Sequence, residues 1–101
     1  MKGEFAGSVS GHDKGRIYVI IEEHEDSVML CDGKHRTLDR LKKKNRKHVQ
    51  IVKRHIFNEV IIEKLSGGEE VTDEEIKRAI RLYCRERGND SILKGDRTGS
   101  N

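Results

Sequence analysis

A short stretch near the N-terminus, residues 9–21, most constrains how this chain can fold. Glycine adopts positive φ without steric cost, so a polar segment bracketed by two glycines is typical of a tight turn. Residues 17–21, a run of β-branched and aromatic side chains, favour a buried or half-buried strand. The stretch therefore predicts a strand, a tight turn and a second strand. The bracketing glycines and the polar residues between them are Gly11, His12, Asp13, Lys14 and Gly15.

Short strands at even spacing are expected throughout the first half of the chain. The sequence predicts strands over residues 4–10, 16–23 and 27–31, with Asp32-Gly33 as a turn after the third. Gly7, inside the first strand, suggests a bulge or the close approach of another backbone. Residues 37–41 are expected either as a fourth strand or as an irregular loop, and residues 49–52 as a last strand. This pattern predicts a mainly β fold, a small barrel or half-barrel.

Helical signals appear only in the second half. Asn58 is expected to N-cap a short helix that Gly67 and Gly68 end, although residues 60–62 would also suit a strand. Thr72 and Glu75 have the spacing of a capping box at the start of an amphipathic helix that ends before residue 88. We therefore expect a barrel over residues 1–55, a helical C-terminal extension over 56–88 and a disordered tail over 89–101. The apolar stripe of the second helix comprises Ile76, Ala79, Ile80 and Tyr83.

Length and composition limit the class of protein. A chain of 101 residues that is 33% hydrophobic and 39% charged predicts one domain with a small core. It has no apolar run near the ~20 residues that cross a bilayer, and its N-terminus lacks a signal-peptide pattern. Two cysteines are too few for a disulfide framework. We therefore expect a cytoplasmic protein whose thiols are reduced.

Positive charge is concentrated in one part of the chain. Residues 34–55 hold ten Lys or Arg and a single acid, Asp39, whereas the remaining residues hold 11 Lys or Arg and 17 acids. Such asymmetry concentrates positive potential on one part of the surface, as expected of a protein that docks one face on a polyanion.

The same residues carry a resemblance to a known family. The pattern V-x-G-x-D-K-G-R over residues 9–16, the following strand, Asp32-Gly33, a basic segment and N-R-K-H-V over residues 45–49 resemble the KOW motif. The likeness is to the large-subunit ribosomal proteins of archaea and eukaryotes in the fourteen-e, six-e and twenty-seven-e group, and to small bacterial relatives. It implies an SH3-like barrel that binds ribosomal RNA, and a role in the ribosome, its assembly or translation. Many KOW motifs have a glycine where this chain has Tyr18, so the second strand need not bend as in those proteins.

The hairpin tip and the basic segment are the expected RNA-binding surface. Phosphate contacts supply most of the sequence-independent affinity for nucleic acid. Folded RNA fits better than single strands because the chain has only four aromatic residues for base stacking. Taken alone, the lysine run would also suit a solvated loop. The expected RNA-binding residues are Gly11, His12, Lys14, Gly15, Arg16, Arg36, Arg40, Lys42, Lys43, Lys44, Arg46, Lys47 and His48.

The sequence favours neither catalysis nor a cofactor. Cys31 and His35 are four residues apart, but no paired Cys or His spacing of a zinc site accompanies them. His12 and Asp13 have no nucleophile in a recognisable frame nearby, and the two bracketing glycines lack the length and helix of a phosphate-binding loop. We therefore expect no enzyme, no metal and no cofactor.

A protein-interaction module is the alternative function. In that case the acidic loop around residues 22–26 and the Ile76, Ile80 and Tyr83 face of the second helix would contact a protein partner, and the lysines would serve solubility. The arginines on the opposite side of that helix, Arg78, Arg81 and Arg85, would instead be available to RNA.

Overall fold

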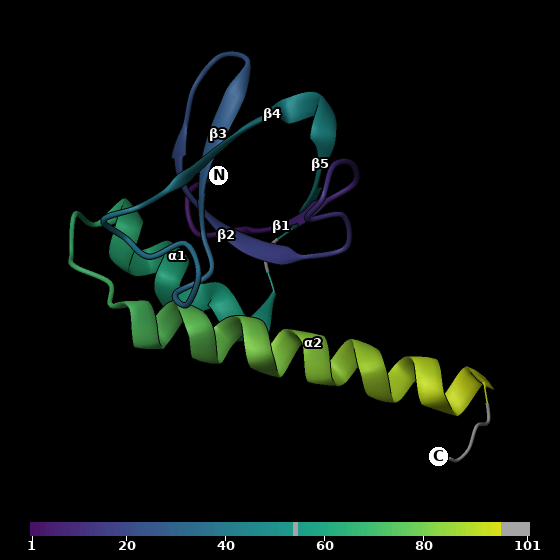
Figure 1. Ribbon diagram of the computed structural model, residues 1–101. Coiled ribbons are helices and arrows are strands. Elements are labelled where there is room, and N and C mark those ends of the chain that lie inside the picture. The colour runs from purple at the N-terminus through teal and green to yellow at the C-terminus, as the bar shows by residue number, and fades with distance from the viewer. Residues whose placement is uncertain (54, 96–101) are drawn as a thin grey trace.

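The computed structural model describes residues 1–53 and 55–95 as a five-stranded antiparallel sheet packed against two α-helices (Figure 1). Two single-turn 3-10 helices, η1 and η2, lie in the connections. None of the helices in these residues is long and apolar enough to cross a membrane. In chain order the elements are β1 (Phe5–Ser8), β2 (Ile17–Glu23), β3 (Ser27–Cys31), β4 (Lys42–Asn45), η1 (Arg46–His48), β5 (Val49–Val52), η2 (Ile56–Asn58), α1 (Glu59–Ser66) and α2 (Asp73–Gly95).

The strands are hydrogen-bonded in the order β4-β3-β2-β1-β5. Phe5 of β1 pairs with Val19 of β2 on one side and with Val52 of β5 on the other, so the last strand returns to lie beside the first. The sheet curls, and η1 joins β4 to β5 (Figure 1). The protein is thus a mixed, sheet-rich fold of five antiparallel strands and two helices. The described ladder ends at β4 and β5, so the expected SH3-like barrel is not confirmed.

Of the two expectations for residues 37–41 the irregular loop is confirmed, and the fourth strand lies later in the chain. Those residues contain a turn, in which the Arg40 amide donates to the Thr37 carbonyl at 2.9 Å, and β4 is the lysine run itself. Lys42 pairs with Leu30 and Lys44 with Val28 of β3. Side chains alternate along a strand, so these two lysines share the face of buried apolar partners, which their methylene stems can cover. Because this half-buried strand begins with three consecutive charged residues, its sequence does not show the apolar alternation that would predict a strand.

The irregularity expected at Gly7 lies elsewhere. Gly7 pairs regularly with Ile17 and Gln50, and the register shifts instead in β2, between Ile20 and Glu22. A bulge at this point adds twist to the strand. Of the two expectations for Gly7, the bulge is therefore wrong. Another backbone does lie beside it, since a Cβ on Gly7 would be 3.9 Å from the Gln50 carbonyl oxygen.

Both faces of the sheet are buried. On one face Phe5, Val19 and Cys31 pack against residues from both helices, among them Ile61 and Ile76. The rings of Phe5 and Tyr83 stack with centroids 4.5 Å apart. The helices therefore share one core with the sheet, and the boundary expected near residue 55 lies within it. On the other face, inside the curl, the second cluster comprises Ala6, Tyr18, Ile20, Val28 and Leu30.

The helices begin close to where the sequence placed them, but Asn58 does not cap α1 with its side chain. Its Oδ1 accepts from the His55 amide at 2.9 Å, and its Nδ2 donates to the Gly3 carbonyl at 2.8 Å. Asn58 is fully buried, so these bonds tie the helical segment to the N-terminus. At the start of α2 the expected capping box is present: the Glu75 amide donates to Thr72 Oγ1, and the Thr72 amide donates to the Glu75 carboxylate.

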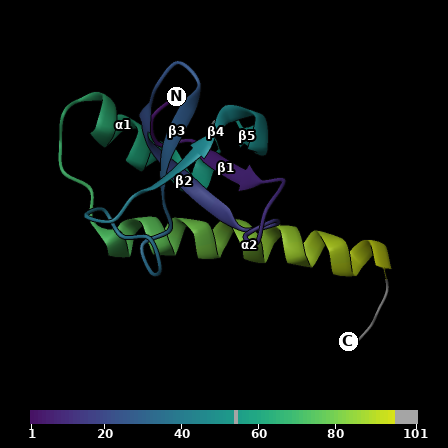
Figure 2. The same ribbon diagram turned by 45° about the horizontal axis from the view of Figure 1, so that its top comes forward.

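The second helix differs from its prediction in length. It continues to Gly95 rather than ending before residue 88, and it extends past the end of the sheet in both views (Figures 1 and 2). Residues 96–101 of the expected disordered tail lie outside the described residues.

The apolar face of α2 packs within the molecule. Ile76 is fully buried and Tyr83 is 8% exposed, while Ile80 is half-buried. The sheet therefore takes up Ile76 and Tyr83 and leaves only Ile80 partly available, so the structure gives no support to a protein partner on this face.

Candidate nucleic-acid interface

The tip of the β1–β2 hairpin is a tight turn that two glycines make possible. Gly11 and Gly15 have φ of +89° and +91°, values that other L-residues rarely adopt. The Gly15 amide donates to the Ser8 carbonyl at 2.8 Å, and the Arg16 amide donates to the Asp13 carbonyl at 2.9 Å. His12 and Lys14 are exposed at this tip, as the sequence predicted.

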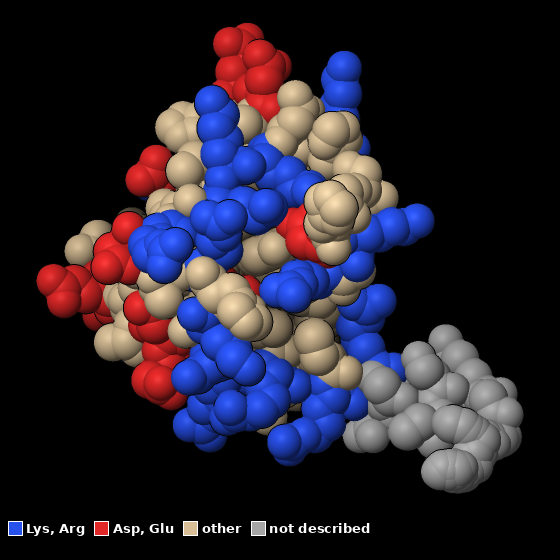
Figure 3. Space-filling model, viewed as in Figure 1, with Lys and Arg blue, Asp and Glu red and all other residues tan. Residues whose placement is uncertain are grey.

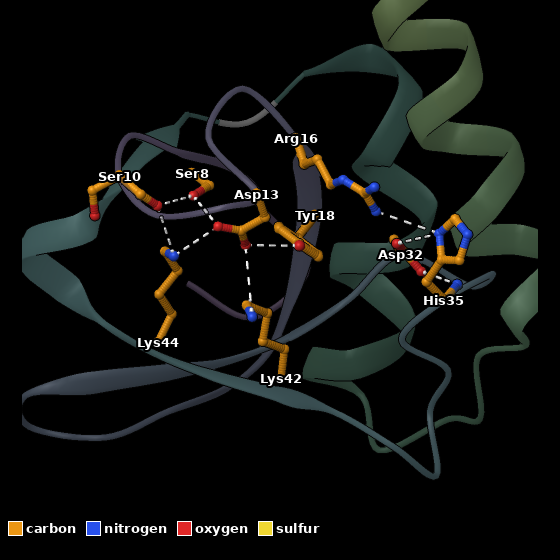
Figure 4. A network of polar contacts seen from close by, with 9 residues as sticks. All are labelled: Ser8, Ser10, Asp13, Arg16, Tyr18, Asp32, His35, Lys42 and Lys44. Carbon is orange, nitrogen blue, oxygen red and sulfur yellow. Dashed lines mark hydrogen bonds and ion pairs between the residues drawn. The ribbon is translucent and has the colours of Figure 1, made fainter.

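Asp13, the acid within the tip, accepts hydrogen bonds from three side chains (Figure 4). Ser8 Oγ and Lys44 Nζ donate to its Oδ1, each at 2.9 Å, and Tyr18 Oη donates to its Oδ2 at 2.8 Å. A second ammonium, Lys42 Nζ, is 3.9 Å from Oδ2. The side chains of Asp13 and Lys44 are only 12% and 11% exposed, so the pair is well shielded from solvent. Asp13 thus holds the tip against β2 and β4.

The contacts of Asp13 shift the acidities within this network. Burial acts to raise the pKa of Asp13, but the hydrogen bonds from Lys44, Tyr18 and Ser8 outweigh it and hold that pKa well below its usual range. Burial, together with the bond to the Asp13 carboxylate, raises the pKa of Tyr18 to about 12. At neutral pH the network therefore consists of an ionised carboxylate and a neutral phenol, which fixes the direction of each hydrogen bond.

A second turn, residues 32–36, lies beside the tip. Asp32 Oδ1 accepts from the amides of Lys34, His35 and Arg36 at 2.8–2.9 Å. Burial acts to raise the pKa of Asp32, but these three bonds hold it below its usual value. Gly33 has φ of +78°, and a Cβ there would overlap the first turn of α2. The Asp-Gly turn therefore fits closely against the helix.

These segments meet around a cleft of about 400 Å³, here called the tip cleft. Arg16 Nη1 lies 3.4 Å from His35 Nδ1, which joins the hairpin to the second turn (Figure 4). Lys42 and Lys44 reach the cleft from β4. The fold thus brings together residues that are far apart in the chain. The lining residues are Gly11, His12, Asp13, Arg16, Tyr18, His35, Arg36, Lys42 and Lys44.

The expected RNA-binding residues are divided between the tip cleft and other surfaces. Six of them line the cleft, and Lys14 and Gly15 are exposed in the same hairpin turn. Lys44 is committed to the fold, since its ammonium also donates to the Ser10 carbonyl at 3.0 Å. Arg46 is engaged away from the cleft, where its Nε donates to the His24 carbonyl at 2.9 Å and its Nη2 lies 3.8 Å from Glu23. The remaining four, Arg40, Lys43, Lys47 and His48, are exposed outside the cleft.

Two residues that the sequence analysis did not assign to RNA binding belong to this surface. His35 lines the tip cleft, and Lys34 is exposed in the same turn. The Asp-Gly signal located their turn, but not its approach to the hairpin. Figure 3 shows Lys and Arg gathered over the middle and lower parts of this face, from the sheet to α2, with acids at its left edge and top. The positive surface therefore includes the helix.

Metal-binding and thiol chemistry find little support here. In the described part of the chain, no group of three or more His, Cys, Asp or Glu is placed to hold a metal ion. Both cysteines are free. Cys31 is fully buried, and burial raises its pKa to about 12, so it acts as a small apolar residue. Cys84 is exposed, but partial burial of its thiol also raises its pKa.

In comparisons with known proteins, the chain matches no protein-family model and no curated sequence.

Proposed function

We propose that this protein binds structured RNA through its basic face, without catalysis. The observation that carries the proposal is the rigid hairpin tip. Asp13 is held by three side-chain donors, and the turn it stabilises leaves His12, Lys14 and Arg16 exposed. A preformed cationic tip docks on a phosphate backbone without first losing the entropy of a mobile loop.

The cations available for phosphates are those that the fold does not use. Within the described residues, four exposed lysines around the basic face make no ion pair, and the Arg16 guanidinium contacts only the ring of His35. Each neutralised phosphate contributes close to one unit to the slope of log K against log salt. About four or five contacts predict a slope of about −4. The four lysines are Lys14, Lys34, Lys43 and Lys47.

The finer assignments belong to the same proposal. We infer an incomplete SH3-like barrel of the KOW type, which is supported by the order β4-β3-β2-β1-β5 and by the 3-10 turn between β4 and β5. The target would be ribosomal RNA in the large subunit, with a role in the ribosome, its assembly or translation, and the protein would act in the cytoplasm. These points rest on the resemblance of residues 9–16 and 45–49 to the KOW motif.

Direct binding to a folded RNA fragment tests the proposal. The double variant Lys43→Glu/Lys47→Glu reverses two exposed and unpaired charges, so the affinity at low salt should fall more than tenfold and the salt slope should become shallower. Lys2→Glu, an exposed charge change near the N-terminus, is the matched control and should change affinity little. Sedimentation of a cell lysate at low and high salt tests ribosome association separately: the protein should travel with the large subunit or its precursors and be released by salt.

The alternative of a protein-interaction module gives opposite results. Most of the α2 face that would contact a protein partner is unavailable, because Ile76 and Tyr83 are buried against the sheet. The acidic loop around residues 22–26 stays exposed. Binding to a protein partner that depends little on salt and is unaffected by the lysine variants would favour the alternative. Absence of measurable RNA binding at low salt would reject the proposed function.

A further inference from the structure

A second cleft of about 360 Å³, here called the side cleft, lies between the hairpin tip, the 32–36 turn and α2. Its surface is mostly apolar and includes the side chains of Ile17, Ile80 and Cys84. Lys34 and Arg81, both exposed, also line it. The tip cleft is lined mainly by charged and polar groups, so the two clefts suit different chemical groups.

The side cleft is continuous with the proposed interface. Arg16 and His35, whose side chains are 3.4 Å apart, line both clefts. A backbone whose phosphates contact the tip cleft can therefore continue directly past the side cleft. A ligand group in the side cleft must accordingly be attached to a phosphate and have an apolar face.

An unpaired nucleobase meets both requirements. Bases in a continuous helix are stacked on their neighbours, so a paired segment offers this cleft only phosphate and sugar. Proteins read splayed-out bases by stacking them on aromatic rings or on guanidinium planes. No aromatic residue is among those lining the side cleft, but Arg16 and Arg81 are, and each carries a planar guanidinium.

The side cleft is open to such a ligand. Apart from Gly15 itself and its two chain neighbours, no heavy atom of the described residues lies within 4 Å of the position that a Cβ on Gly15 would occupy, so a nucleotide can approach the backbone there closely. Lys77, which also lines the cleft, is paired with Glu74 at 3.1 Å, but Glu74 is 82% exposed. Surface pairs of this kind contribute little free energy, so the lysine can exchange this partner for a phosphate.

We propose, in an inference that rests on the proposed function, that the side cleft binds one unpaired nucleotide next to the phosphates that dock on the tip cleft. The recognised RNA is therefore a helix interrupted by a bulge or loop. Base stacking on the cleft adds sequence-tolerant affinity to the electrostatic docking.

Two hairpin RNAs that differ by a single bulged 2-aminopurine test this inference. The wild-type protein should bind the bulged hairpin about tenfold more tightly than the fully paired one. Fluorescence of the 2-aminopurine should rise on binding, because the base leaves the RNA stack. Arg81→Lys keeps the charge and removes the plane, so it should abolish the preference while leaving affinity for the paired hairpin almost unchanged. Arg85→Lys, on the same helix but outside the cleft, is the matched control and should keep the preference.

The outcomes separate this inference from the function on which it rests. Equal affinity of the wild type for both hairpins, with the effect of the Lys43 and Lys47 changes retained, would overturn the nucleotide site and leave RNA docking intact. An equal effect of Arg81→Lys and Arg85→Lys on both RNAs would also overturn it. Failure of the wild type to bind either hairpin at low salt would reject the proposed function itself.

Discussion

Replacing Asp13 with Asn should destabilise the fold more than neutralising any other single acid in the hairpin region would. The change keeps the size of the side chain and removes the charge that two lysines face. Lys44, with a side chain only 11% exposed, would keep the Ser10 carbonyl as a hydrogen-bond acceptor, and buried Tyr18 would lose its carboxylate acceptor. Removing one partner of a buried ion pair costs about 3–5 kcal/mol. Because Asn retains some hydrogen bonding, we expect a loss of about 3 kcal/mol in the free energy of unfolding at neutral pH.

The pH dependence of this loss identifies its cause. The pKa of Asp13 is lower in the folded state than in the unfolded chain, so its stabilisation is complete above the unfolded value of about 4. As the pH falls below about 4, the unfolded chain binds the proton first, and the stabilisation is progressively lost. The difference between wild type and Asp13→Asn should therefore stay nearly constant from pH 7 down to about 5 and shrink as the pH is lowered further towards 3.

Urea unfolding at several pH values measures this difference directly. Asp26→Asn, the same chemical change in the exposed loop between β2 and β3, is the matched control and should stay within about 0.5 kcal/mol of the wild type. At neutral pH the Asp13 variant should also melt about 10–20 °C lower. A variant as stable as the wild type at pH 7, or a loss that does not change down to pH 3, would refute the assignment of Asp13 as the anchor of the tip.

Three further predictions concern other parts of the structure. Gly33→Ala should cost more stability than Gly15→Ala, by about 2 kcal/mol or more in urea unfolding: both glycines have positive φ, but only at the first would the added Cβ meet the backbone of α2. Lys44→Glu should lower the melting temperature because it places a second carboxylate beside the Asp13 network, whereas Lys43→Glu should leave melting unchanged and weaken only RNA binding. A thiol reagent at mildly alkaline pH should modify only Cys84 in the folded protein and both cysteines after unfolding, as counted by mass spectrometry.

Local signals in the sequence were sufficient to locate most elements. Strand β3 and the start of α2 lie where turn and capping signals placed them, because these signals depend on neighbouring residues only. The β4 strand was missed because its pairing partner, β3, and not its own composition, makes it a strand. Asn58 was placed correctly at the start of α1, but its side chain bonds to Gly3, a contact that spans 55 residues. Such errors share one cause: the deciding interaction is distant in the chain.

The candidate site shows the same division between local and distant causes. The glycines of the tip follow from the hairpin pattern alone, and their positive φ confirms that part. In the sequence the lysines of residues 42–44 look equivalent, whereas the alternation of β4 directs Lys42 and Lys44 towards Asp13 and leaves Lys43 exposed. A charge count therefore overstates the number of cations available for phosphates.

Because some lysines pair with Asp13 and others stay exposed, so basic a surface can be stably folded. Several cations meet in the tip cleft, and without an acid their mutual repulsion would oppose the close approach of β4 to the hairpin. Asp13 neutralises the most buried of them, Lys44, and in doing so fixes the turn that exposes Lys14. Asp13 thus lowers the total positive charge of the surface. It should nevertheless raise the phosphate affinity of the cations that stay exposed, because a cation on an ordered turn loses less entropy when it binds a phosphate. In the proposed interface, the placement of charge matters more than its amount.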